Sequence, residues 1–236
     1  MNRAQMVASL GSFRYQNRIF NLTAHNLSNA QTPGFKKDVS LFHAFLDERV
    51  DLQALVQEDG IKTQFQQGTV QPTGNALDLA IEGQGFFKVK TPQGIRYTRA
   101  GHLKMNSEKV LVDANGYPVL GRQKEISVKG QKIVIGKDGT VTVDGNEVDQ
   151  LALVSFPSLD SLVKEGNSLF RLEEGVKESQ VSDRQIIQGS LEMSNVNPVE
   201  EMVRMIDSLR TYESCLKLIQ SQDEMDGKAA NEIGRV

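Results

Sequence analysis

Few residues in this chain have the types and spacing that catalysis or metal binding requires. The three histidines, His25, His43 and His102, stand at no metal-ligand spacing from one another or from Cys215, so we expect no metal site. Cys215 is the only cysteine, which excludes a disulfide within the chain, and its apolar surroundings favour a small buried residue over a nucleophile. Carboxylates are plentiful, but no motif pairs two of them for acid–base chemistry. We therefore expect no catalytic residue.

The segment Gly83-Gln84-Gly85 is the one candidate for a phosphate-binding loop. A dinucleotide fingerprint requires a third glycine at position 88, where Lys88 stands, and the segment precedes an expected strand instead of opening a helix. The glycines therefore predict a bend between two strands, and we expect no nucleotide or other cofactor.

The composition narrows the class of protein further. The chain has 236 residues, of which 39% are apolar and 24% charged, so it is neither a disordered acidic tail nor a membrane protein. The net charge of −3 gives no support for binding nucleic acid. No stretch approaches 18 consecutive apolar residues, and residues 1–16 lack the apolar run of a signal peptide. We expect a protein that is either cytosolic or exported without a cleaved signal.

The first elements that could position functional residues are two long helices at the chain ends. Residues 3–29 predict the first helix, which Thr32-Pro33-Gly34 should stop. Its seam has the alternating spacings of a heptad, with one polar member that could fix register. The seam consists of Met6, Leu10, Phe13, Asn17, Phe20, Ala24 and Leu27.

The last helix has clear start signals. Asn197 is a candidate cap, Pro198 suits the first helical position, and Glu200 completes a capping-box spacing, whereas Gly227 is a plausible end. Apolar residues again recur every three and four positions. This second seam consists of Met202, Met205, Leu209, Tyr212, Leu216 and Ile219.

Two such helices cannot cover all of their own apolar surface. Residues 1–37 contain five bases and no acid, and residues 198–236 contain eight acids and five bases, which favours pairing weakly. Pairing would still leave apolar residues on flanking faces, and neighbouring subunits could cover them. These residues are Val7, Ile19, Leu22, Val203, Ile206 and Leu218. We therefore expect self-assembly through the terminal segments.

Between the helices the sequence predicts a turn-rich β region, since 16 of the 20 glycines lie between residues 60 and 189. Period-two patterns predict strands over 77–81, 87–90 and 151–156. Residues 132–135 and 140–143 flank Asp138-Gly139 and predict a hairpin, and Asp144-Gly145 marks the next turn. The pattern over 36–75 is undecided, with a helix or an extended arm around residues 41–56.

Several runs together resemble the bacterial flagellar rod and hook proteins. Residues 24–36 are close to that family's N-terminal signature, with His25 and Ser28 as mild departures. The matching signature positions are Asn26, Leu27, Asn29, Thr32, Gly34 and Phe35. Further runs that match lie at 68–81, 83–87, 97–101, 116–121, 188–197, 200–202 and 210–213.

The resemblance implies a fold and a division into parts. The fold would be α+β, with long N- and C-terminal helices pairing as a coiled coil that lines the inner tube, and a mainly-β middle domain outside. The expected parts are an N-terminal helix of the assembly domain at 1–35, an arm or linker at 36–75, a β-rich outer domain at 76–190 and a C-terminal assembly helix at 191–236. The expected assembly interface comprises the members of both seams.

The resemblance also implies a function and a location. The chain would be a structural subunit of the flagellar basal-body rod, a hollow drive shaft that crosses the periplasm and transmits torque for motility. Its partners would be other copies of itself, neighbouring rod subunits and the flagellar type III export apparatus, without nucleic acid, membrane insertion or a small-molecule substrate. A proximal rod subunit is favoured, a distal rod subunit is the close alternative, and a hook-type subunit is less favoured.

Two other classes remain open at this point. A secreted cell-wall-acting enzyme would require a paired-carboxylate or metal site, and the sequence displays none. An adhesin with a coiled-coil stalk would require a removable signal and would work outside any flagellum.

Overall fold

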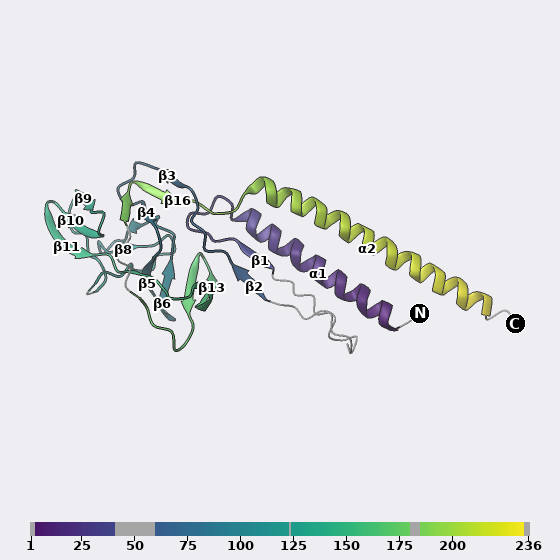
Figure 1. Ribbon diagram of the computed structural model, residues 1–236. Helices are drawn as coiled ribbons and strands as arrows, with labels where there is room; N and C mark the ends of the chain where they lie inside the picture. The colour runs from purple at the N-terminus through teal and green to yellow at the C-terminus, as the bar shows by residue number, and fades with distance from the viewer. Residues whose placement is uncertain (1–2, 41–59, 123, 180–184, 234–236) are drawn as a thin grey trace. The chain divides into compact units, whose positions relative to one another are not determined.

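The computed structural model describes residues 3–40, 60–122, 124–179 and 185–233 (Figure 1). The chain divides into two compact units. A helical unit contains residues 1–28, 38–62 and 197–236, and a β unit contains residues 29–37 and 63–196. The helix or arm expected around residues 41–56 lies outside the described residues.

The helical unit contains helix α1 (Arg3–Ser28), helix α2 (Pro198–Ile233) and the paired strands β1 (Asp38–Ser40) and β2 (Ile61–Thr63). The start of α2 is as predicted, because the side-chain oxygen of Asn197 accepts hydrogen bonds from the backbone N–H of Val199 at 3.1 Å and of Glu200 at 3.5 Å. The predicted end at Gly227 is wrong. A single glycine weakens a helix by about 1 kcal/mol without stopping it.

The prediction that the two terminal helices pair as a coiled coil through apolar seams is also wrong. The structure has one N-terminal helix and one C-terminal helix beside a mostly β middle part, but the seam residues Met202, Leu209 and Leu216 remain 46%, 44% and 36% exposed. Asn17 of the first seam is exposed as well. Among the helix side chains that the structure describes, the buried ones are polar instead: Thr23, Asn26, Glu201 and Ser208. A coiled coil requires apolar side chains at those covered positions.

The β unit is built from short antiparallel strands. Its largest sheet has five strands in the order β12-β5-β6-β14-β13, and a second sheet has the order β11-β10-β9. Two-stranded sheets pair β15 with β4, β16 with β3 and β7 with β8. The strands are β3 (Val70–Pro72), β4 (Leu79–Glu82), β5 (Phe86–Thr91), β6 (Gly94–Thr98), β7 (Lys104–Met105), β8 (Leu111–Val112), β9 (Ile133–Ile135), β10 (Thr140–Val143), β11 (Asn146–Gln150), β12 (Leu153–Val154), β13 (Leu162–Gly166), β14 (Leu169–Leu172), β15 (Gln185–Gln188) and β16 (Ser190–Glu192), with a 3-10 turn at Leu159–Ser161.

The local turn predictions for this unit are confirmed. Strands β9 and β10 pair antiparallel with Val141 opposite Ile135, and β10 pairs with β11 across the turn at Asp144 and Gly145. Gly83 and Gly85 both have positive φ and bend the chain between β4 and β5. They therefore form a bend and do not open a helix, as their spacing predicted.

Two clusters of buried side chains stabilise the β unit. The larger is mainly aliphatic and includes Leu79, Leu111, Val141 and Leu151 together with the ring of Phe87. The smaller is aromatic, and its rings meet at centroid distances between 4.9 and 5.9 Å, in tilted and edge-on arrangements that favour aromatic pairs. Its members include Phe65, Phe86, Tyr97, Phe156 and Phe170. No helix in the described part of the chain has the length and apolar content that crossing a membrane requires.

Candidate functional site

Asn26 joins three elements of the helical unit. Its side-chain oxygen accepts from the backbone N–H of Asp38 at 3.0 Å, and its amide nitrogen donates to the backbone oxygen of Asp38 at 2.8 Å. The same nitrogen lies 3.5 Å from a carboxylate oxygen of Glu201. Asn26 and Glu201 are both 1% exposed. This cluster, the Asn26 clasp, therefore connects α1, β1 and α2 through one buried amide.

Further along the helices, one contact involves the small side chain of Ser208 and another involves two aromatic rings. The hydroxyl of Ser208 lies 3.5 Å from the backbone oxygen of Gln16, and the rings of Phe13 and Tyr212 stand 5.1 Å apart at 36°. These two contacts between the helices are therefore polar and aromatic. Of the predicted interface residues, Phe20, Leu27 and Met205 are half-buried, and Met6, Leu10 and Ile219 have side chains outside the description.

Replacing Asn26 by alanine is expected to destabilise the helical unit by about 2–4 kcal/mol, because the backbone N–H and C=O of Asp38 lose their partners in a buried position. Urea unfolding followed by the helical circular dichroism signal measures the change. Asn21→Ala is the matched control, since Asn21 is exposed and its side-chain amide donates to the exposed side chain of Asn17 at 2.8 Å. The control should stay within about 0.5 kcal/mol of the unaltered chain. Equal effects of the two substitutions would contradict a role for the clasp.

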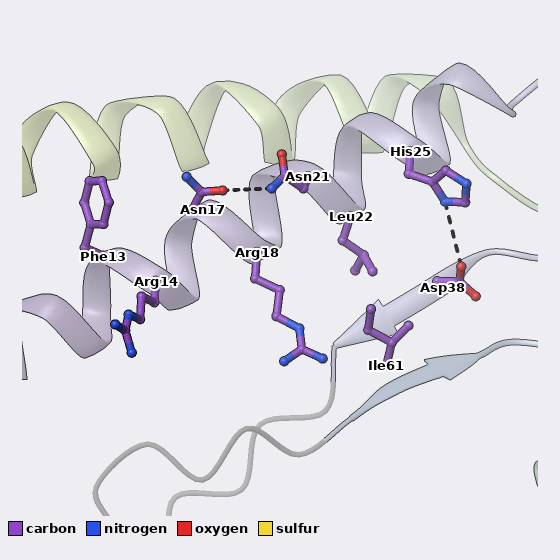
Figure 2. A pocket seen from close by; sticks show the side chains of 9 residues that line it. All are labelled: Phe13, Arg14, Asn17, Arg18, Asn21, Leu22, His25, Asp38 and Ile61. Carbon is purple, nitrogen blue, oxygen red and sulfur yellow. Dashed lines mark hydrogen bonds and ion pairs between the residues drawn. The ribbon is translucent and has the colours of Figure 1, made fainter. Parts of the chain in front are cut away.

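A depression of about 610 Å³ lies on the side of α1 that faces β1 and β2 (Figure 2). We call it the α1 groove. Figure 2 shows Arg18 and Leu22 pointing toward these strands and Arg14 on the same side of α1, whereas Phe13 points toward α2. His25 closes one end of the groove, with its ring nitrogen 3.8 Å from a carboxylate oxygen of Asp38. The lining residues are Phe13, Arg14, Asn17, Arg18, Asn21, Leu22, His25, Asp38 and Ile61.

Helix α2 carries two exposed faces. The α2 apolar stripe follows a three-and-four spacing and consists of Val199, Met202, Ile206, Leu209 and Leu216, all exposed. The α2 acidic face consists of Glu200, Val203 and Asp207, which share one side of the helix because they are three and four residues apart. Extended apolar surface of this kind marks sites of protein–protein contact.

The second part of the N-terminal signature, residues 29–36, begins with a tight turn in the β unit. Asn29 accepts hydrogen bonds at its backbone oxygen from the N–H of Thr32, at 3.1 Å, and at its side-chain oxygen from the Thr32 hydroxyl, at 3.2 Å. Gly34 has a φ of +68°, and its N–H donates to the backbone oxygen of Glu192 at 2.7 Å. The buried ring of Phe35 lies 3.8 Å below the ammonium group of Lys164, at a cation–π distance.

Directly after this turn, a buried ion cluster ties distant segments together. Lys36 and Glu192 are fully buried and their charged atoms lie 2.5 Å apart. Lys36 also donates to the backbone oxygen of Gln66 at 2.7 Å, and Glu192 lies 3.6 Å from the guanidinium of Arg99. Burial lowers the pKa of Lys36 and of Arg99, although the Glu192 carboxylate acts in the opposite direction for both. Two cations share one carboxylate, and we call this group the Lys36 cluster.

A second asparagine secures the same region. The side-chain oxygen of Asn195 accepts from the backbone N–H of Lys37 at 2.7 Å, and its amide nitrogen donates to the backbone oxygens of Gln64 at 2.8 Å and Gln66 at 3.1 Å. Asn195 thus holds two segments of the β unit in place beside the Lys36 cluster.

Among the described residues, a hydroxyl, a histidine and a carboxylate come together at Asp78. Its carboxylate receives the hydroxyl of Thr73 at 2.7 Å on one oxygen and lies 2.7 Å from a ring nitrogen of His102 on the other. Nucleophilic catalysis requires the histidine between the hydroxyl and the acid, so that it can take the hydroxyl proton. Here the acid lies between them, and the arrangement stabilises the turn that follows Thr73. Within the described ranges no three His, Cys, Asp or Glu residues are grouped to hold a metal ion.

The structure therefore brings together residues that apolar periodicity could not find. Glu201 and Ser208 carry no apolar signal, and a buried lysine such as Lys36 is indistinguishable from a solvated one by residue type. One indication of their importance is present in the sequence: Lys36 and Glu192 both lie inside runs that match the rod and hook family.

Comparisons with known proteins identify the class. Residues 80–143 match the family model for the flagellar hook protein FlgE/F/G D1 domain, and residues 187–232 match the model for the flagellar basal body rod FlgEFG protein C-terminal region. The flagellar basal-body rod protein FlgF of Caulobacter vibrioides is 36% identical over 228 residues, covering 93% of each chain. FlgG of Borreliella burgdorferi is 34% identical with 98% coverage of each, and FlgF of Salmonella typhimurium is 32% identical with 88% and 89%.

The chain belongs to the family of flagellar basal-body rod proteins. It is a structural protein of the bacterial flagellum, and its place is the basal body.

Proposed function

We propose that this chain builds the rod by associating with further copies of itself and with neighbouring rod subunits through its terminal helices. The observation that carries the proposal is the α2 apolar stripe, whose five large side chains are exposed although the helix already contacts α1. Water contact with such a stripe is unfavourable, and burial against another subunit removes it. The predicted interface residues Met202, Leu209 and Leu216 belong to this stripe.

The size of the chain supports an FlgF-type subunit over an FlgG-type subunit, and a proximal rod position remains our proposal. The alignment to FlgG of Borreliella burgdorferi runs over 264 residues, which exceeds the 236 residues of this chain and requires insertions in the relative. The alignment to FlgF of Caulobacter vibrioides runs over 228 residues without that excess. Finding the chain in purified basal bodies, at a position occupied by FlgF and not by FlgG, tests this assignment.

Two finer points complete the proposal. A rod subunit has to leave the cytoplasm, and we assign that step to the flagellar type III export apparatus, as the family resemblance implies. The role is structural and involves no enzymatic reaction. Incubating the purified chain with cell-wall material tests this point, because release of soluble fragments would contradict it.

Leu209→Asp tests assembly through the α2 apolar stripe. A charge in the middle of the stripe cannot be buried against a partner without a large desolvation cost, so we expect loss of rod assembly and of motility. Because Leu209 is exposed in the single chain, the thermal midpoint of the purified protein should change little. Val148→Asp is the control, since Val148 is an equally exposed apolar residue on β11. Normal rods with Leu209→Asp would contradict the proposal.

A further inference from the structure

We propose that the α1 groove receives the α2 acidic face of a second copy of this chain. The inference rests on the proposed function, because it names the surfaces through which one copy meets the next. It adds a specific pairing that the apolar stripe alone does not define.

The groove has a cationic rim and an apolar floor. Arg14 and Arg18 extend along one side, and Leu22 and the half-exposed Ile61 provide apolar surface between α1 and β2 (Figure 2). Helix α1 contributes three arginines and no acid. The groove therefore fits a partner surface with an apolar residue flanked by carboxylates.

The α2 acidic face has this composition. Val203 is 53% exposed and stands between Glu200 and Asp207 on one side of the helix. Helix α2 as a whole contains eight acids and four bases. Within the part of the chain that the structure describes, Arg14, Glu200 and Asp207 form no ion pair, so these charges are available to a partner. Opposite charges on facing surfaces steer association and fix its register.

The placement of the two surfaces prevents a chain from satisfying both by itself. Arg18 and Leu22 extend into the groove from the side of α1 that faces β1 and β2, away from the chain's own α2 (Figure 2). The acidic face of that helix therefore cannot enter the groove without separating the helices at the Asn26 clasp. A contact between groove and acidic face joins two different surfaces of two copies, and such head-to-tail contacts extend into open filaments when they do not close into a ring.

Disulfide cross-linking between two differently tagged full-length chains tests the pairing. One chain carries Ile61→Cys and the other Val203→Cys, and both carry Cys215→Ser, so that a disulfide can form only between copies at Cβ separations of about 3.5–4.5 Å. Under mild oxidation of the assembled mixture we expect a mixed dimer on a denaturing gel. The control replaces Val203→Cys with Val148→Cys, which is 46% exposed on the β unit. Equal yields with both partners, or no mixed dimer, would overturn the proposal.

Charge reversal gives an independent test. Arg14→Glu with Arg18→Glu, or Glu200→Arg with Asp207→Arg, should weaken self-association in sedimentation velocity about tenfold or more, because like charges then face each other. The chain that carries all four changes should return to within about threefold of the original, since the charges are again opposite. If self-association of the chain with all four substitutions is weakened by as much as the two double substitutions together predict, the contact is excluded.

The outcomes separate this inference from the proposed function. If Leu209→Asp abolishes assembly but the cysteine pair yields no mixed dimer, the α2 apolar stripe remains the assembly surface and the groove pairing is wrong. If Leu209→Asp assembles normally, the proposed function fails whatever the cross-linking shows.

Discussion

Replacing Glu192 by leucine should lower the free energy of unfolding of the β unit by about 3–5 kcal/mol, because it leaves Lys36 and Arg99 buried without a counter-charge. Lys36→Met should cost less. It removes one of two cations and leaves Arg99 paired with the Glu192 carboxylate, so the remaining charges balance. Chemical denaturation followed by a probe of the β unit, such as the ellipticity of its aromatic cluster, measures both.

The double variant Lys36→Met with Glu192→Leu completes the test. Its total loss of unfolding free energy should be smaller than the sum of the single losses, because Lys36→Met removes one of the two cations that Glu192→Leu leaves without a counter-charge. A Lys36→Met variant that is less stable than Glu192→Leu would show that hydrogen bonds of the lysine, for example to Gln66, dominate over charge balance.

Gly34→Ala is expected to destabilise the β unit by more than about 2 kcal/mol. The residue has a φ of +68°, which costs a residue with a side chain about 1–2 kcal/mol, and a Cβ there would stand 2.3 Å from the backbone nitrogen of Ala100. Since Ala100 contributes backbone atoms, the clash cannot be relieved by rotating a side chain. The turn of the N-terminal signature would have to move.

Gly74→Ala is the matched control for this experiment. Gly74 has a φ of +76°, but no atom lies within 4 Å of a Cβ built there, so only the conformational cost of about 1–2 kcal/mol applies. The difference between the two variants isolates the close approach of Gly34 to Ala100. Similar melting temperatures for both would argue against that approach.

Local rules predicted much of this fold. The hairpin around Asp138 and Gly139 follows from a turn that only a few residue types form, and the start of α2 at Pro198 follows from the cap at Asn197. These features depend on residues within four positions of one another. Neighbouring residues alone therefore determine these features, and a short stretch of sequence is enough to predict them.

The arrangement of the helices could not be obtained in the same way. A heptad of apolar residues indicates which side of a helix avoids water, but not whether its own chain or another subunit covers that side. In this protein the polar clasp at Asn26 and Glu201 faces inward, and Leu209 remains exposed. The burial of Lys36 against Glu192 was equally hidden, because it depends on two residues 156 positions apart.

That separation has a consequence for the order in which the β unit forms. Strand β16 pairs with β3 and strand β15 with β4, so the last strands of the unit close against its first ones. Contacts between residues so distant in the chain slow folding, since a large loop must be closed before they form. During synthesis from the N-terminus, the β unit therefore cannot be completed until residue 192 has been added. Chains that stop before this residue should remain susceptible to proteolysis.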